Sequence, residues 1–199
     1  MSDKRRELTD FCSLLYERRL TFSAGGNVSV RDGETILITP SGRNKGLLSP
    51  EDMVAVDMDG QPLEGGKPSI ELGFHLAIYR SRPEVGAVVH CHPLHSTALA
   101  VRGEPLRCGL TPEGVLLLGD VPLVPYATPG SEELVRLVSA YALDHDAIIM
   151  EKHGALTVGA DLEQAYNRME ELEFQAQLQF LAGDAEEISD AERRRILGP

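Results

Sequence analysis

The 199-residue sequence contains no tryptophan and only 5% aromatic residues, so stacking of nucleic-acid bases is a poor explanation for its function. The three cysteines, Cys12, Cys91 and Cys108, are odd in number and widely spaced, which argues for reduced thiols rather than a disulfide framework. No apolar run approaches the roughly 20 residues needed to cross a bilayer, and the charged start lacks the apolar segment of a signal peptide. We therefore expect a cytoplasmic protein.

Positive charge is also scarce, with 19 Lys and Arg residues against 31 Asp and Glu residues and a formal net charge of −12. Such a balance disfavours nucleic acid and anionic membranes as partners. A small anionic substrate stays compatible with it, because a metal ion and backbone amides can make one pocket locally positive.

Strand-like and helix-like patterns alternate along the chain without a repeat or a linker, which predicts a single α/β domain over residues 1–199. A chain of this length can bury ~70% of its unfolded surface unaided, so a metal would serve chemistry rather than folding. Helices are predicted over residues 4–19, 72–79, 94–101, 132–142 and 162–181. Strands are predicted over residues 28–30, 34–39, 53–58, 121–126 and 147–150, and in the run that leads into His90. Short hairpins between several strands favour a partly antiparallel sheet.

A pair of histidines is the strongest chemical signal in the sequence. The apolar run Gly86-Ala87-Val88-Val89 leads into His90 and His92, and residues two apart in an extended strand project from the same face. Two imidazoles in one space are half of a tetrahedral metal site. A second apolar run, residues 147–150, ends shortly before His153, which is therefore a candidate third ligand. The alternative is that these are ordinary surface or hydrogen-bonded core histidines.

Two further segments have the chemistry of an anion site. Gly25-Gly26-Asn27 can turn backbone amides toward a bound anion, although such a pair is often only a turn. Ser69 is expected to cap the helix that follows it, which places Glu71 in the first turn beside the positive end of the helix dipole. Residues 102–121 are expected to be irregular, with a turn at Thr111-Pro112-Glu113-Gly114.

Nearly the whole chain resembles the class II aldolase and adducin-head family, most closely its L-fuculose-phosphate aldolases. The resemblance rests on ordered motifs that include Gly25-Gly26-Asn27-Val28-Ser29, Thr39-Pro40-Ser41-Gly42, Pro68-Ser69-Ile70-Glu71, His90-Cys91-His92-Pro93 and His153-Gly154. It implies a three-layer α/β/α sandwich around a largely antiparallel central sheet. It also implies a homotetramer with active sites between subunits.

The resemblance assigns roles to individual residues. His90, His92 and His153 match the zinc ligands, and Glu71 matches the acidic residue that coordinates the resting metal and then acts as acid and base. The substrate phosphate is expected to bind at Gly26, Asn27, Ser41, Gly42 and Ser69. Zinc is the expected cofactor, although a nitrogen and oxygen site accepts other divalent first-row metals.

Two departures from the fuculose-phosphate aldolases stand near these motifs. Ala24 replaces a residue that usually carries a hydroxyl, and Ile70 replaces a second serine, so two phosphate donors are missing. No tyrosine lies between His92 and Gly119 or after Tyr166, where the family's aldolases place tyrosines near the aldehyde.

The resemblance predicts an aldehyde-lyase that cleaves a ketose 1-phosphate or related hydroxy-keto compound into dihydroxyacetone phosphate, or a similar fragment, and an aldehyde. A divalent ion would stabilise the enediolate that forms. Alternatives with the same chemistry are a pentulose-phosphate 4-epimerase, a methylthioribulose-phosphate dehydratase and an acid-sugar-phosphate decarboxylase. A non-catalytic interaction domain like the adducin head is a third reading, which the complete set of three histidines and Glu71 disfavours.

Overall fold

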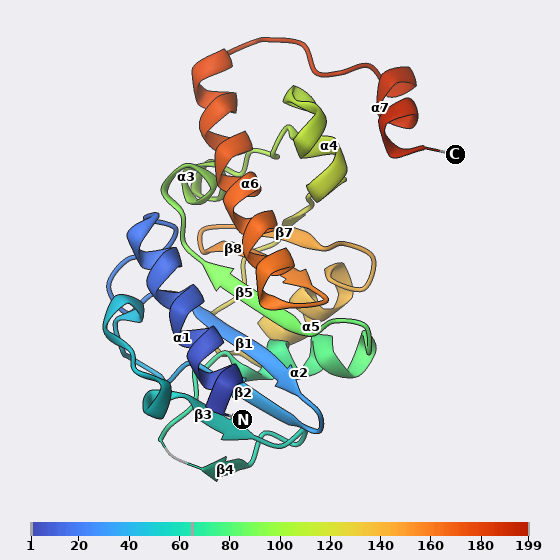
Figure 1. Cartoon of the computed structure of the whole chain (residues 1–199). Helices are drawn as coiled ribbons and strands as arrows, with labels where there is room; N and C mark the ends of the chain where they lie inside the picture. The colour runs from blue at the N-terminus through green and yellow to red at the C-terminus, as the bar shows by residue number, and fades with distance from the viewer. Residues whose placement is uncertain (1, 65, 199) are drawn as a thin grey trace.

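The structure is a computed structural model that describes residues 2–64 and 66–198, and its centre is a sheet (Figure 1). Within these residues eight strands form this sheet in the order β4-β3-β2-β1-β5-β8-β7-β6. The strands are β1 (Asn27–Asp32), β2 (Thr35–Ile38), β3 (Val54–Val56), β4 (Pro62–Glu64), β5 (Ala87–Cys91), β6 (Leu123–Val124), β7 (Ala147–Met150) and β8 (Gly154–Gly159). All neighbours pair antiparallel except β6 and β7, which confirms the largely antiparallel sheet.

Helices cover both faces of the sheet. They are α1 (Ser2–Glu17), α2 (Leu72–Ser81), α3 (Leu94–Arg102), α4 (Pro112–Leu118), α5 (Glu132–Tyr141), α6 (Leu162–Ala182) and α7 (Asp190–Leu197). Short 3-10 turns η1 (Lys45–Leu47) and η2 (Pro50–Asp52) lie between β2 and β3, and η3 (Cys108–Leu110) lies between α3 and α4. None of the helices in the described part of the chain combines the length and apolarity that crossing a bilayer demands.

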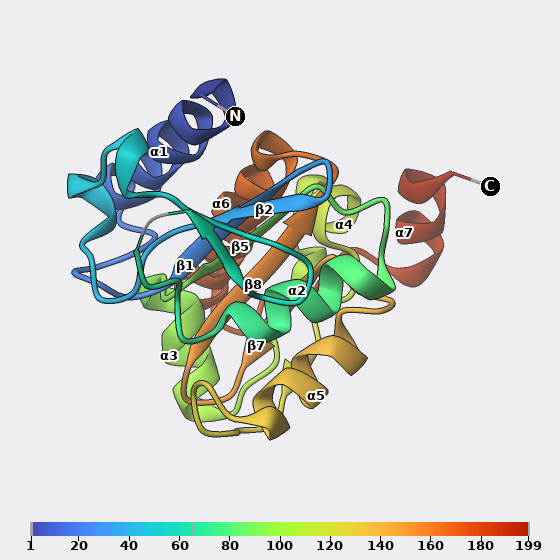
Figure 2. The same ribbon diagram turned by 90° about the horizontal axis from the view of Figure 1, so that it is seen from below.

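The alternation of side chains along β5 explains the layers. Val89 and Cys91 point to one face and pack with α1, α3 and α6, whereas Val88 points to the other face and packs with α2 and α5. Figure 1 shows α1 and α6 crossing in front of the sheet, and Figure 2 shows α2 and α5 on the opposite side. The described residues therefore form the predicted α/β/α sandwich.

Most local features of the structure follow from local sequence signals. The hairpin between β1 and β2 turns at Gly33, which has a φ of +64°. Ser131 caps α5 as its side chain accepts a hydrogen bond from the N–H of Leu134 at 3.1 Å. The predicted helices at residues 4–19, 94–101 and 162–181 correspond to α1, α3 and α6.

Some local predictions were wrong or incomplete. Thr111 begins helix α4 instead of a turn, because its hydroxyl accepts a hydrogen bond from the N–H of Gly114 and Pro112 occupies the first helical position. The expected strand over 121–126 is only Leu123–Val124. Strand β8 was not predicted, since its start at Gly154 follows directly on the His153 turn.

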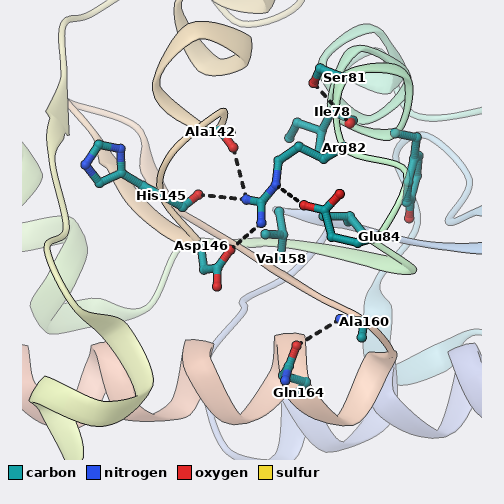
Figure 3. Close-up of polar contacts among 12 residues, drawn as sticks. Ile78, Ser81, Arg82, Glu84, Ala142, His145, Asp146, Val158, Ala160 and Gln164 are labelled. Carbon is teal, nitrogen blue, oxygen red and sulfur yellow. Dashed lines mark hydrogen bonds and ion pairs between the residues drawn. The ribbon is translucent and has the colours of Figure 1, made fainter. Parts of the chain in front are cut away.

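One carboxylate joins the two helical layers near the edge of the sheet. Asp146, just before β7, binds Arg82 at the end of α2 at 2.7 Å and Arg168 of α6 at 2.5 Å. Arg82 also donates to the carbonyl oxygens of Ala142 and His145 (Figure 3). Both arginine side chains are only 16% exposed, so these bonds are partly shielded from water.

We expect Asp146→Asn to lower the free energy of unfolding by about 1–3 kcal/mol, because two half-buried guanidinium groups would then face each other without a shared anion. Urea denaturation measures this change. Glu84→Gln is the matched control. Glu84 also binds Arg82, but its side chain is 64% exposed, so its loss should change stability much less. Equal effects of the two variants would contradict a joining role for Asp146.

Candidate metal centre

Three histidine rings meet at one end of the central strands. His90 is on β5, His92 follows the end of that strand, and His153 lies in the tight turn between β7 and β8. Antiparallel pairing places β5 beside β8, with His90 opposite Leu156. The His90 Nε2 and His92 Nε2 atoms are 3.1 Å apart, and the ring centres of His90 and His153 are 4.8 Å apart. The sequence prediction that these side chains converge therefore agrees with the geometry.

Glu71, at the start of helix α2, faces the histidines. It occupies the N-cap position of α2 with a φ of −101°, and its side chain makes no capping hydrogen bond. The expectation that Ser69 caps the helix and that Glu71 lies in its first turn was therefore wrong. The Ser69 hydroxyl instead accepts a hydrogen bond from the N–H of Glu71 at 3.2 Å. The carboxylate oxygens of Glu71 lie 3.3 Å from His90 Nε2 and 3.3 Å from His153 Nε2.

A buried chain of hydrogen bonds holds Glu71 from behind. Asn27 Nδ2 donates to Glu71 Oε2 at 2.7 Å, which leaves Asn27 Oδ1 to accept from His75 Nε2 at 2.5 Å. His75 therefore carries its proton on Nε2, and its Nδ1 accepts from the Ser29 hydroxyl at 2.7 Å. Ser29 in turn accepts from the Tyr79 hydroxyl at 2.8 Å. Every donor in the chain points toward Glu71.

Burial sets the protonation of the site. Burial and the neighbouring His90 and His153 lower the pKa of His92 to about 3, and burial and His90 lower that of His153 to about 4. Burial alone would raise the pKa of Glu71, but hydrogen bonding and charge from His90, with help from His153 and Asn27, hold it well below its usual range. At neutral pH His92 and His153 therefore offer neutral imidazoles and Glu71 offers a carboxylate, the forms that bind metal.

The donor set fits a divalent metal ion. One nitrogen from each of His90, His92 and His153 lies within 4.8 Å of the others, so the three could hold a metal ion. His90 Nδ1 donates to the carbonyl oxygen of Ala155 at 2.9 Å, so the lone pair on its Nε2 atom can bind a metal ion. Glu71 Oε1 is buried without a hydrogen-bond partner among the described residues, as expected of an atom that binds a cation.

Glu71, His92 and His153 border a cavity of about 530 Å³. Its walls also contain all the residues predicted to bind phosphate, which are Gly26, Asn27, Ser41, Gly42 and Ser69. The amide of Asn27 is committed to Glu71 and His75, which the sequence did not indicate. Gly26 and Gly42 have φ values of +68° and +70°, conformations that glycine adopts without strain.

Other candidate residues lie elsewhere. Cys91 is buried on the opposite face of the sheet, and His95 binds Glu173 at 2.8 Å, and neither residue borders the cavity. Lys45 also borders the cavity and was not among the site residues predicted from the sequence. A lysine between two glycine-containing turns was the only signal that pointed to it.

Comparison with known proteins agrees with the fold. The family model described as Class II Aldolase and Adducin N-terminal domain matches residues 6–180. An L-fuculose phosphate aldolase of Methanococcus maripaludis is 40% identical over 178 residues, covering 88% of this chain and 97% of the relative. A 3-oxo-tetronate 4-phosphate decarboxylase of Escherichia coli K12 is 39% identical over 186 residues, covering 90% of this chain and 87% of the relative.

A solved structure is similar over almost the full length. The crystal structure of YgbL from Escherichia coli superimposes with a TM-score of 0.94 at 35% identity and covers 99% of both chains. Its description leaves aldolase, epimerase and decarboxylase activities open. The chain belongs to the class II aldolase and adducin N-terminal domain family.

We expect Gly154→Ala to weaken zinc binding by about 10–100-fold, the range that misplaced ligands usually cost. A Cβ atom at this position would lie 2.4 Å from His92 Cδ2 and 2.5 Å from the Cys91 carbonyl oxygen, so His92 must move. Competition with a chromophoric chelator measures the affinity. Gly66→Ala is the control, since its Cβ would meet only Val54 at 4.0 Å. Unchanged zinc affinity in Gly154→Ala would mean that this contact does not position His92.

Proposed function

We propose that this protein is a zinc-dependent class II aldolase. Its substrate would be a ketose 1-phosphate or a related hydroxy-keto compound, and its products dihydroxyacetone phosphate, or a similar fragment, and an aldehyde. The observation that carries the proposal is the convergence of His90, His92, His153 and Glu71 beside a cavity in a member of this family. The coordinating residues would be the three histidines and, in the resting enzyme, Glu71.

Each part of the site has a role in this reaction. A divalent ion held there would act as a Lewis acid that stabilises the negative charge developing on the substrate oxygens. Glu71 would move a proton at the carbon where the bond breaks, a step in which a positioned base typically contributes ~10²–10⁴-fold. Asn27 would keep the Glu71 carboxylate in place through its hydrogen bond at 2.7 Å.

The glycine and serine turns would bind the phosphate. Within the described residues, the backbone N–H groups of Gly26 and Gly42 and the hydroxyl of Ser41 have no hydrogen-bond acceptor. All three residues, together with Ser69, border the cavity next to Glu71. Free donors around a cavity are the usual means of binding a phosphate.

The proposal also includes the setting of the enzyme. We infer a single-domain cytoplasmic protein that assembles as a homotetramer, with active sites between subunits and no nucleic-acid or membrane partner. The resemblance to the family supports the assembly, and the net charge of −12 supports the absence of polyanionic partners.

A decarboxylase that acts on an acid-sugar phosphate is the second candidate, and one feature of the cavity favours it. Its described lining contains no tyrosine, and other than Glu71 and the histidines its ionisable side chains are Lys45 and Lys152. Aldol cleavage must take a proton from the hydroxyl group that becomes the aldehyde, whereas loss of carbon dioxide from a 3-oxo acid needs no such transfer. Both reactions leave the same kind of enediolate, so His90, His92, His153 and Glu71 serve either one.

We expect zinc-loaded protein to release an aldehyde from L-fuculose 1-phosphate or another ketose 1-phosphate. The test is a panel of ketose phosphates, a 3-oxo-tetronate 4-phosphate and unphosphorylated analogues, scored for aldehyde, carbon dioxide, epimer and loss of water. Chelator-treated protein is the control and should be inactive. Carbon dioxide release without aldehyde would replace the aldolase by the decarboxylase. No product from any substrate in the panel would contradict both.

We expect Glu71→Gln to retain zinc but to slow exchange of the α-proton of the product ketone with deuterated water by at least ~100-fold, since an amide cannot act as the base. Proton NMR measures the exchange. The control is Glu173→Gln, because Glu173 also faces a histidine, His95 at 2.8 Å, but lies outside the cavity. Undiminished exchange in Glu71→Gln would assign the base to another group.

A further inference from the structure

Lys45 is a buried cation in the wall of the catalytic cavity. It lies in η1, and only 2% of its surface is exposed. Lysine is rarely buried to this degree without an ion-pair partner, because removing an ammonium group from water is costly. Burial accordingly lowers the pKa of Lys45 from its ordinary value. A residue that breaks this rule beside an active site is a candidate for function.

The partners of the ammonium group are neutral and incomplete. Lys45 Nζ donates to the carbonyl oxygens of Ala24 at 3.1 Å and Arg43 at 2.9 Å. An ammonium group has three N–H donors, so one donor has no acceptor within the described residues. No carboxylate of residues 2–64 and 66–198 lies within 4.0 Å of Nζ. The positive charge of Lys45 is therefore available to a ligand.

The surroundings of Lys45 show what kind of ligand would fit. The cavity that Lys45 borders is also bordered by Gly26, Ser41 and Gly42. Within the described residues, the N–H groups of Gly26 and Gly42 and the hydroxyl of Ser41 have no acceptor. Neutral donors beside the Lys45 ammonium group, which has no carboxylate partner, are the groups that bind a dianion.

We propose that Lys45 binds the phosphate group of the substrate and supplies the positive charge of the phosphate subsite. This proposal rests on the proposed function and deepens it. With Ala24 and Ile70 in place of residues that would carry hydroxyl groups, a charge-assisted hydrogen bond from Lys45 would stand in for the missing neutral donors. It would also select phosphorylated substrates over unphosphorylated ones in a protein whose net charge of −12 otherwise repels anions.

The test is the binding of inorganic phosphate to zinc-loaded protein, measured by isothermal titration calorimetry for the wild type and Lys45→Gln. Glutamine keeps N–H donors for the carbonyl oxygens of Ala24 and Arg43 but removes the charge. We expect Lys45→Gln to weaken phosphate binding by about tenfold or more, the usual effect of losing a hydrogen bond from a charged group. Lys45→Arg, which keeps the charge, should recover part of the affinity.

Lys152→Met is the matched control. Lys152 borders the same cavity, but its side chain is 59% exposed and its Nζ lies 3.0 Å from a carboxylate oxygen of Glu151. Its loss should change phosphate affinity by less than about twofold, since an exposed and paired charge contributes little. A repeat with chelator-treated protein separates phosphate bound by the metal from phosphate bound by Lys45. Equal affinity in Lys45→Gln and wild type would overturn the proposal.

A purely structural role for Lys45 gives a different result. If Lys45 only ties the Ala24 and Arg43 carbonyl oxygens together, Lys45→Gln would keep its phosphate affinity. If Lys45→Gln does not fold, wild-type crystals soaked in inorganic phosphate decide the question. An anion within hydrogen-bond distance of Lys45 Nζ would support the proposal, and an anion bound only elsewhere would overturn it.

The outcome of the phosphate-binding test does not depend on the proposed reaction. Phosphate binding is measured without turnover, so it can fail in a protein that still cleaves a ketose phosphate. It can equally succeed in a protein that cleaves none of the substrates in the panel. The first result would remove only the role of Lys45, and the second would remove only the reaction.

Discussion

The position of β5 between β1 and β8 is the constraint on which the rest of the site depends. This pairing sets Asn27 of β1 opposite His90 and brings the turn that carries His153 to the end of the same strand. A shift of one residue in either register would send His90 to the other face of the sheet, because side chains alternate along a strand. The apolar residues that fix the register, such as Val88 and Val89, therefore also fix the site.

The second feature of the molecule is a buried chain of hydrogen bonds whose donors all point toward Glu71. Glu71, Asn27 and His75 are all buried, and such groups are costly unless each finds a partner. The chain from Tyr79 through Ser29 satisfies each member and leaves only Glu71 Oε1 without a hydrogen bond. These hydrogen bonds therefore hold the Glu71 carboxylate in place. The carboxylate oxygen that faces His153 takes no part in them.

Much of the fold could be predicted because its signals are local. Helices α1, α3, α5 and α6 have apolar residues at helical spacing, and Gly33 and Ser131 have the chemistry of a turn and a cap. The errors occurred where two local signals compete. Thr111-Pro112 is compatible with either a turn or a helix start, and packing of α4 against α6 favours the helix. Strand β8 begins at Gly154, so its first residue looked like part of a turn.

The sequence by itself determined which chemical groups are present: two histidines at a strand end, a third after another strand, a glutamate near a helix start, and two turns rich in glycine and serine. Only the tertiary structure decided that the side-chain amide of Asn27 binds both Glu71 and His75. It also decided that Lys45 is a buried cation in the wall of the cavity beside Glu71. The physical reason is distance along the chain. Local spacing fixes where a side chain points on its own element, but hydrogen bonds between residues 44 or 48 positions apart exist only once the sheet and helices have packed.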